Sequence, residues 1–413
     1  MALASFKEQM DNSYQEIFMK SLVAKEIANS RLEKNLSYGA SVKRVKMFVD
    51  GIRVRDIASH TNRVIDQTND QGETMVINKN KGTTFRLMKN EETQAGPLSP
   101  AEFAGAKVAM KTAIVVDGDV LAEVKNAWAP FDNGDLTTLV SSGTPVDFTK
   151  ANMELILTRA QAKLGKNLGG MAGIINTAWV IDSYGLAEVA QYLMAKNTDF
   201  SKAIFQNGLI NDLKANNAEI YVSEALTSDI VINMGTNATA GQTVTVGNFT
   251  FTFVASIGTT AGNVLLGGTV DASRANLVAA INAHLLDDPV DTANYIVFKD
   301  VPASYTYAGA QLSELRLTAT NNTAGNQVLI TGIGCGRQLV ATTVTSATIG
   351  SNVVHFYYGK KGAIDVVIQD EVDTEVKEDP YQRAKIILSD KLYGIKTFGD
   401  GKMKFLDVKV KTQ

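Results

Sequence analysis

Charge is distributed unevenly along this chain, and the break in that distribution limits the fold more than any motif does. Residues 230–350 hold ten charged side chains among 121 residues, or one in twelve, whereas one residue in four is charged elsewhere. The same stretch is rich in Thr and Gly, which favour short strands and tight turns. The flanking sequence is typical of a mixed helix-and-strand domain. The pattern therefore predicts a β-rich domain inserted into an α+β host.

Length and composition indicate a folded chain of two or three domains, with 413 residues, 45% of them hydrophobic, and only seven prolines. The formal net charge of -3 is too small to favour specific DNA binding or attraction to an acidic membrane. A single cysteine, Cys335, excludes an intrachain disulfide and a cysteine-based metal site. Charged Lys7, Glu8 and Asp11 stand where a signal peptide is apolar, and no window is long enough for a membrane span. We expect synthesis in a reducing cytoplasm and no membrane partner.

The first hundred residues have helix and strand signals but little apolar surface. Residues 10–36 combine loosely periodic apolar side chains with many charges, which predicts a polar helical arm. Asp50-Gly51 favours a tight hairpin within residues 42–55, and a turn at residues 79–82 favours a second hairpin over residues 74–89. An extended, solvated two-stranded region of this kind needs a partner chain to stabilise it.

A long helix is predicted from Ser99 to about Trp128. Ser99 and Glu102 form a capping box, with Pro100 at the first helical position. At 1.5 Å per residue the helix would be roughly 42 Å long, which suggests a spine. Apolar side chains recur at helical spacing at Phe103, Ala106, Met110, Ile114, Leu121, Val124 and Trp128.

Shorter elements follow along the chain. The charge-poor stretch contains an alternating segment over residues 243–254 that predicts a hairpin turning near Gly247-Asn248, and one helix over residues 271–286. Host helices are expected at 149–166 and 184–196. Host strands are expected at 179–182, 218–223, 352–358, 363–369, 384–395 and 403–410.

No motif predicts catalysis, a cofactor or a metal. Residues 132–135 (Asp-Asn-Gly-Asp) could supply oxygen ligands to calcium, but a polar turn is favoured. The glycine-rich run at residues 332–336 lacks the strand–turn–helix unit of a dinucleotide loop. His60, His284 and His355 lie on different expected elements, which argues against a shared metal site. We expect no enzymatic activity and no cofactor.

Two charged segments are candidate subunit contacts. The second hairpin is basic and has few acids near it. The acidic run at residues 370–379 is typical of the solvated face of an exposed segment, and it is also a candidate electrostatic partner for the basic hairpin. The side chains predicted to lie at a subunit interface are Lys79, Lys81, Arg86, Lys89, Glu371, Asp373 and Glu375.

Taken together, the host segments resemble the major capsid (coat) protein family of tailed bacteriophages. The order of polar arm, long two-stranded loop, spine helix, mixed α/β domain and closing strands is similar to that family. Residues 36–42 (LSYGASV) look like the arm entering the extended loop, and 176–196 like the opening of the axial domain. Residues 218–224 (AEIYVSE) and 392–394 (LYG) look like an axial strand and the return to the peripheral domain.

The resemblance implies an α+β capsid fold with an inserted mainly-β domain. It also implies a division of the chain into an N-terminal arm (1–42), an extended loop (43–98), a peripheral domain with the spine helix (99–175), an axial domain (176–229 and 351–383), the inserted β-rich domain (230–350) and return strands to the peripheral domain (384–413).

The same resemblance implies that the function is self-assembly. Hexamers and pentamers would close an icosahedral shell around double-stranded DNA, contacted non-specifically, with scaffolding and portal proteins guiding assembly in the bacterial cytoplasm. Decoration or auxiliary capsid proteins are candidate partners of the insert in the virion. Two alternatives stay open: a bacterial nanocompartment shell protein of the same fold, and a surface adhesin or glycan-binding protein built on the β-rich domain.

Overall fold

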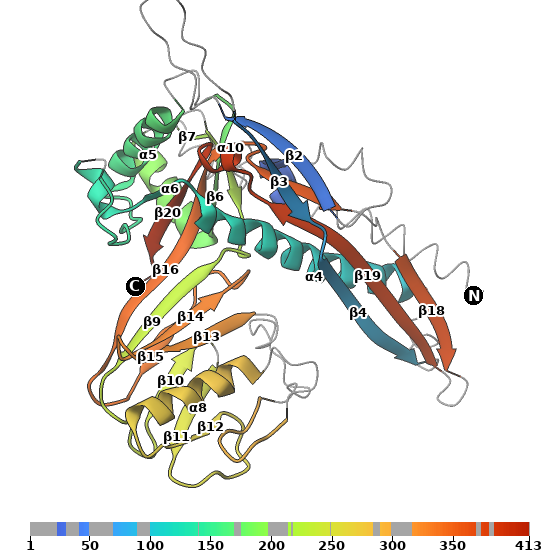
Figure 1. Cartoon of the computed structure of the whole chain (residues 1–413), viewed down its shortest axis with the longest axis vertical. Helices are drawn as coiled ribbons and strands as arrows, with labels where there is room; N and C mark the ends of the chain where they lie inside the picture. Colours follow the sequence, from blue (N-terminus) through green and yellow to red (C-terminus); the bar gives the residue numbers. More distant parts are fainter. Residues whose placement is uncertain are drawn as a thin grey trace, which may run out of the picture. The chain divides into compact units, whose positions relative to one another are not determined.

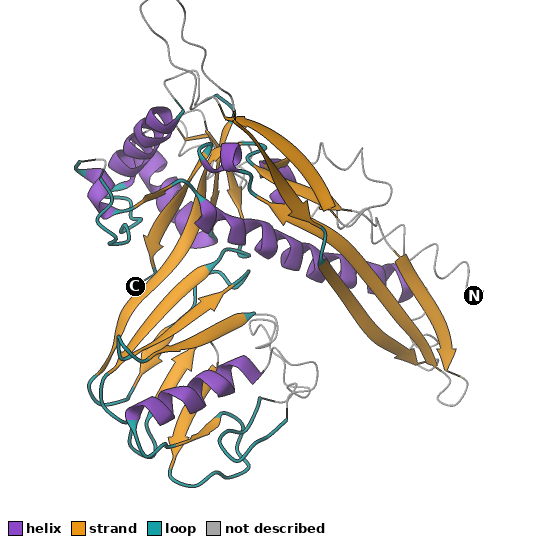
Figure 2. Cartoon of the chain, in the orientation of Figure 1, coloured by secondary structure: helices purple, strands orange, loops and turns teal. Residues whose placement is uncertain are grey.

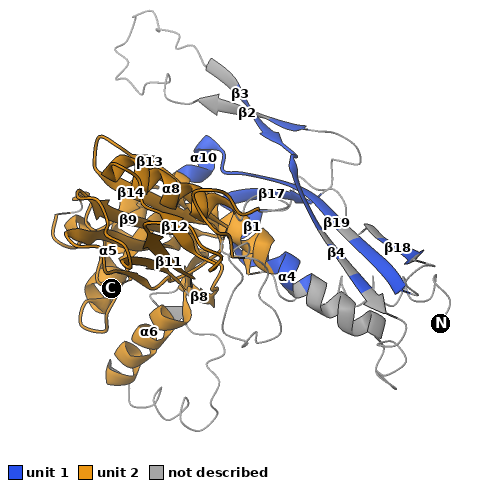
Figure 3. Cartoon of the chain, turned by 90° about the horizontal axis from the view of Figure 1, so that it is seen from below, with its two compact units in different colours: residues 1–21, 25–113, 362–402 blue, residues 22–24, 114–361, 403–413 orange. Residues whose placement is uncertain are grey.

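A computed structural model describes most of the chain, and within it the fold is mixed α+β with several sheets, which confirms the predicted class (Figures 1 and 2). Two compact units divide the chain (Figure 3). Unit 1 comprises residues 1–21, 25–113 and 362–402, and unit 2 comprises residues 22–24, 114–361 and 403–413. The described residues are 23–29, 41–48, 69–88, 100–138, 140–168, 175–196, 214–215, 218–247, 249–283, 290–298, 316–368, 373–379 and 384–412.

Unit 1 contains a two-stranded antiparallel sheet of β2 (Ser41–Phe48) and β3 (Asn69–Val76). The expected tight turn at Asp50-Gly51 does not join this pair, because Phe48 lies opposite Asn69. The register places Val42 opposite Met75, and both side chains are buried in a small apolar cluster. Burial of that cross-strand pair fixes the register, since a slip by one residue would expose both side chains.

A second sheet of unit 1 is built around one long strand, and it corrects the second predicted hairpin. β4 (Lys79–Met88) does not pair with β3 but lies antiparallel to β19 (Ala384–Lys396) over ten residue pairs. β18 (Asp373–Asp379) and β17 (Ile364–Ile368) also pair with β19. A long partner strand satisfies more backbone groups of β4 than a four-residue turn and a short return strand could.

The N-terminal segment also differs from its prediction. Within the range expected to be helical, the described residues form one helical turn, α2 (Ala24–Ile27), followed by β1 (Ala28–Asn29). β1 pairs in parallel with β17, and Asn29 Nδ2 donates to Asp365 Oδ1 at 2.7 Å. The side chain of Ile27 is fully buried. Strand pairing and burial therefore outweigh the weak helical periodicity here.

The spine helix, α4 (Pro100–Ala122), begins where predicted and ends earlier, because the chain continues as a 3₁₀ turn, η3 (Glu123–Asn126). The boundary between the two units falls within α4, after Ala113. The predicted apolar stripe is buried only in part: Leu121 and Val124 are fully buried, whereas Ile114 is 55% exposed and Trp128 is 69% exposed. In unit 2 the buried positions of α4 also include three consecutive polar or small residues, Asp117, Gly118 and Asp119.

Unit 2 is centred on a nine-stranded sheet whose longest strand, β16 (Ala347–Lys360), pairs with three others. Trp179 stacks on Tyr358 with ring centroids 4.3 Å apart, and Phe148 packs edge-on to Phe356 at 5.1 Å. The other strands are β5 (Ala129–Phe131), β6 (Thr177–Ile181), β7 (Lys214–Ala215), β8 (Ala218–Val222), β9 (Ser228–Met234), β13 (Leu317–Asn322), β14 (Gln327–Gly332) and β20 (Phe405–Lys411). The remaining helical elements outside the charge-poor stretch are η4 (Asn133–Leu136), α5 (Met153–Asn167), α6 (Ser183–Lys196) and, in unit 1, α10 (Gly399–Lys402).

The charge-poor stretch has a sheet, a helix and an apolar core of its own. β10 (Thr243–Val246) and β11 (Phe249–Val254) form the expected hairpin, with Gly247 in the left-handed region at φ 61°. β12 (Asn263–Leu265) and β15 (Val340–Thr342) complete this sheet, and α8 (Val270–Asn282) is its helix. The core includes Phe251, Phe253, Leu277, Ile281 and Val328, and every residue of it lies between 230 and 349.

Two continuous strands carry the chain into and out of this stretch. β9 and β16 pair antiparallel from Ser228 opposite Val354 to Met234 opposite Ala347, with an irregularity between Ile349 and Ser351. The change in composition near residues 230 and 350 therefore falls within paired strands (Figure 1). β14 and β13 continue the same sheet into the charge-poor stretch.

Candidate assembly surface

Three strands of unit 1 place the two predicted charged segments in one sheet. β19 lies in the middle, with β4 on one side over ten residue pairs and β18 on the other side over seven. In the described part of the chain, β4 and β18 each pair only with β19. Each of them is therefore an edge strand with one row of backbone groups turned away from β19.

The two edge strands carry opposite charge. β4 contains three basic side chains and no acid, and β18 contains four acids and one lysine, Lys377. Arg86 and Glu375 are exposed, whereas Lys79 and Lys81 are half-buried. The acids of β18 are Asp373, Glu375, Glu378 and Asp379.

The register keeps the basic and acidic strands apart within one chain. Arg86 of β4 lies opposite Ile386 of β19, which in turn lies opposite Lys377 of β18. The two charged side chains in this row across the sheet are therefore both basic. Adjacent strands are about 4.8 Å apart, which separates β4 from β18 by roughly 10 Å. Within β18, Lys377 Nζ is 3.1 Å from Glu375 Oε2, and both side chains are 60% exposed. The register thus places the basic and the acidic set of side chains on opposite edges of one sheet.

The sequence predicts Lys79 and Lys81 in a turn, but they lie within strand β4 and pair with residues of β19. Lys79 lies opposite Tyr393, and Lys81 lies opposite Lys391, which is only 4% exposed. Sequence reasoning missed Lys391, because a lysine inside an alternating strand gives no local signal of burial. Of the other predicted interface residues, Lys89 and Glu371 lie outside the described residues, and for Asp373 only the backbone position in β18 is described.

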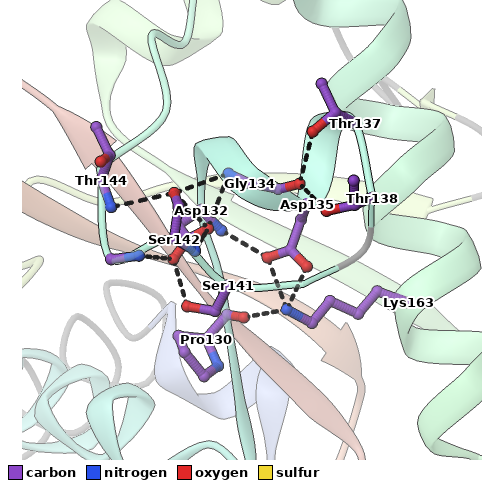
Figure 4. A network of polar contacts seen from close by, with 11 residues as sticks. Pro130, Asp132, Gly134, Asp135, Thr137, Thr138, Ser141, Ser142, Thr144 and Lys163 are labelled. Atoms are coloured by element: carbon purple, nitrogen blue, oxygen red, sulfur yellow. Dashed lines mark hydrogen bonds and ion pairs between the residues drawn. The ribbon is translucent and has the colours of Figure 1, made fainter.

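The candidate calcium loop is a network of hydrogen bonds (Figure 4). The Asp132 carboxylate accepts from the backbone N–H groups of Gly134, Ser142 and Gly143 and from the hydroxyl of Ser141. These donors outweigh the effect of burial and hold the pKa of Asp132 below its usual value. The carboxylate oxygens thus face N–H and O–H donors, an environment that stabilises the turn and competes with a cation.

Asp135 completes the network by binding a buried lysine. Its two oxygens are each 2.6 Å from Lys163 Nζ, which comes from α5, and Asp135 Oδ2 also accepts from the Asp132 N–H at 2.9 Å. The side chain of Asp135 is 0% exposed and that of Lys163 is 9% exposed. The pair joins η4 to α5 and leaves this loop with a structural role.

The described histidine lies in a buried charge cluster. His355 Nδ1 is 2.7 Å from Asp407 Oδ1, and its Nε2 is 3.2 Å from Asp229 Oδ2. Burial disfavours the charged ring, but the hydrogen bonds to the two carboxylates outweigh it and raise the pKa of His355 to about 9. Asp229 also binds Lys125 Nζ at 2.7 Å. His60 and His284 lie outside the described residues, and within the described ranges no group of three or more metal-ligating side chains occurs.

The glycine-rich run at residues 332–336 packs against protein. Burial raises the pKa of the Cys335 thiol to about 11, so the thiol is neutral at physiological pH. Its Sγ is 3.0 Å from the Ser228 hydroxyl, and the segment that follows is strand β15. Among the described helices, none is long and apolar enough to cross a membrane.

The chain was compared with known proteins. No protein-family model and no curated protein sequence matches it. Among solved structures, it is similar to one of Mycobacterium phage Che8, at 13% identity and a TM-score of 0.45, covering 93% of this chain and 90% of that one. It is also similar to the capsid of the cyanophage P-SCSP1u (9% identity, TM-score 0.45, 94% and 87% covered). A third is the capsid of a native GTA particle (8% identity, TM-score 0.44, 95% and 90% covered).

Proposed function

We propose that this protein is a major capsid protein that self-assembles into hexamers and pentamers of an icosahedral shell around double-stranded DNA. The sequence resemblance to tailed-phage coat proteins supports this, and so does the described element order. That order begins with a polar N-terminal segment and the extended β2–β3 pair. It continues with the long helix α4, a mixed α/β body and closing strands. In this proposal the shell is a virion capsid assembled in the bacterial cytoplasm with scaffolding and portal proteins.

The observation that carries the proposal is the pair of oppositely charged edges on the β4–β19–β18 sheet. Two different edges of one chain that attract each other form a heterologous, head-to-tail contact, and such contacts generate rings when the rotation closes. Complementary charge steers this encounter and sets its register more than it adds affinity. We infer that the basic edge of one subunit, with Lys79, Lys81 and Arg86, meets the acidic edge of the next, with Glu375 and Asp373. Lys89 and Glu371 extend the two sets.

The domain division follows as part of the same proposal. The arm (1–42) and extended loop (43–98) reach to neighbours, and residues 99–175 and 384–413 form the peripheral domain. Residues 176–229 and 351–383 form the axial domain. The insert (230–350) has its own core and few charges, which suits neighbouring capsomers or decoration proteins better than DNA.

A charge exchange tests the proposal. Negative-stain microscopy of purified protein should show closed shells, and Lys79→Glu/Lys81→Glu should raise the protein concentration at which they form. Adding Glu375→Lys and Glu378→Lys to the same chain restores the attraction with reversed sign, so assembly should recover. Lys150→Glu/Lys411→Glu, which changes two exposed lysines in unit 2, is the matched control. If the variant with all four substitutions does not recover assembly while the control assembles normally, the edge-to-edge contact is contradicted.

The alternatives are distinguished by whether particles form and by what the particles contain. A nanocompartment shell would also form closed particles, but it would package protein instead of DNA. An adhesin or glycan-binding protein would form no shells at any concentration. Nuclease-protected DNA inside particles from infected or co-expressing cells distinguishes a capsid from both.

A further inference from the structure

One turn of α4 contacts the charge-poor stretch within unit 2. Arg316 immediately precedes β13, and its guanidinium forms an ion pair with Asp119 of α4 through Nη2. Its Nη1 also donates to the Val115 carbonyl oxygen at 3.3 Å. The Asp119 side chain is 0% exposed and that of Arg316 is 20% exposed. A buried carboxylate of the helix therefore binds a cation that the insert contributes.

The adjacent residue of the helix brings the two backbones into contact. A Cβ on Gly118 would lie 2.8 Å from Gly334 Cα, which is closer than real contacts allow. Gly334 has φ 73°, a conformation that favours glycine. Glycine inside a helix costs about 1 kcal/mol relative to alanine. The close approach of the loop at residues 332–336 explains why glycine occupies this position of the helix despite that cost.

A second buried carboxylate follows the same pattern. Asp182 lies between β6 and α6, its side chain is 0% exposed, and it forms an ion pair with Arg337. Asp182 Oδ1 also accepts from the Gly185 N–H at 2.6 Å, at the start of α6. The Arg337 guanidinium carbon is 5.5 Å from the centroid of the Tyr184 ring, within cation–π range. Two of the insert's four basic residues are thus directed at buried acids outside it.

We propose that the insert is an intramolecular brace, in which residues 316–337 supply cations to Asp119 and Asp182 and so fix α4 and the β6–α6 junction. Removing one partner of a buried ion pair leaves a desolvated charge, and this is strongly destabilising. Removing both partners eliminates that charge. The insert is then a required part of the folded subunit, and its loss is tolerated only when these carboxylates are neutralised as well.

A double-mutant cycle on the full chain tests the brace. The variants are Arg316→Ala, Asp119→Asn and the two combined, and the readouts are the urea midpoint and amide hydrogen exchange of residues 115–122. Arg316→Ala should lower the midpoint and speed exchange of these amides at least tenfold. The combined variant should recover most of both losses, because no buried charge remains unpaired. The Arg337–Asp182 pair should behave in the same way.

The control is the exposed Glu375–Lys377 pair of unit 1, for which Glu375→Gln/Lys377→Ala should show no measurable coupling. If Arg316→Ala does not fold, a folded combined variant still supports the brace, and an unfolded one overturns it. Unchanged α4 exchange in Arg316→Ala, or losses that simply add in the combined variant, would also overturn it.

Discussion

His355 of β16 and Asp407 of β20 form a buried hydrogen bond of 2.7 Å across adjacent strands, and Asp229 of β9 contacts the other ring nitrogen. The cluster thus joins the strand that enters the charge-poor stretch, the strand that leaves it and the last strand of the chain. Because the His355 ring is 3% exposed, its charge state matters for the stability of the whole sheet.

We expect this cluster to make the protein sensitive to alkaline pH. The pKa of His355 is raised from 6.5 to about 9, so its stabilising contribution is complete below pH 6.5 and is lost as the pH rises through 9. The loss across this window is roughly 3 kcal/mol. Chemical unfolding from pH 6 to pH 10 should show that decline in the native protein and a flatter profile in His355→Gln. Parallel profiles would contradict the assignment.

Arg274 is predicted to be the most sensitive polar residue of the insert. It is 0% exposed, and it donates to the Met234 carbonyl oxygen at 2.6 Å and to Asn321 Oδ1 at 3.1 Å, besides its ion pair with Asp271. Arg274→Ala removes the donor to the buried Met234 carbonyl oxygen and to the half-buried Asn321 amide oxygen, and should cost about 1–3 kcal/mol of unfolding free energy. Lys166→Ala is the control, because the Lys166 side chain is exposed and its loss should cost under about 1 kcal/mol. Equal losses in the two variants would refute this role.

Gly118→Ala should destabilise the protein although alanine is the better helix former. Helix propensity alone predicts a gain of about 1 kcal/mol, but the added Cβ would clash with the Gly334 backbone. Thermal unfolding should show a lower Tm for Gly118→Ala. Gly235→Ala is the matched control, since nothing lies within 4 Å of its Cβ position. A raised Tm in Gly118→Ala would mean that the helix and the loop do not touch.

The charge-poor stretch should fold when it is produced alone as residues 228–354, cut at the register pair Ser228–Val354. Its apolar core is internal, and about 120 residues are enough for an independent domain. Circular dichroism should show a β-rich spectrum with one cooperative thermal transition. A disordered spectrum would show that this core depends on the remainder of unit 2.

Shell assembly should weaken as salt is added. Exposed ion pairs contribute at most about 1 kcal/mol each, and the Debye length falls from about 10 Å at 0.1 M to about 3 Å at 1 M. Light scattering should show a higher threshold concentration at 1 M than at 0.1 M salt, with a smaller change in Lys79→Glu/Lys81→Glu. A threshold independent of salt would argue that the edges do not meet through charge.

Local signals predicted the elements that depend on neighbours in sequence. The Pro100 helix start, the Gly247 hairpin and the β6–α6 unit all follow from short-range capping, turn and periodicity rules. The pairing of β4 with β19 could not be predicted in this way, because about 300 residues separate the partners. A plausible turn at residues 79–82 therefore suggested the wrong hairpin.

The candidate site was predictable in its charges but not in its geometry. Composition alone separates a basic segment around Arg86 from an acidic one around Glu375. Their places on two edges of one sheet depend on β19, which supplies both ladders. The sequence around Asp119 and Asp182 does not indicate that these acids are buried. Their burial depends on ion pairs with Arg316 and Arg337, which are distant in the sequence.

The continuity of β9 and β16 has a consequence for how such a chain can change over generations. The segment enters and leaves through neighbouring antiparallel strands, so it adds no crossing to the path of the chain. A short turn between β9 and β16 could therefore replace it without changing the topology of the remaining chain. Topology makes the segment easy to gain or lose, whereas the acids at Asp119 and Asp182 make it hard to lose. In a lineage that loses the segment, Asp119 and Asp182 should therefore be replaced by uncharged residues before the segment is lost.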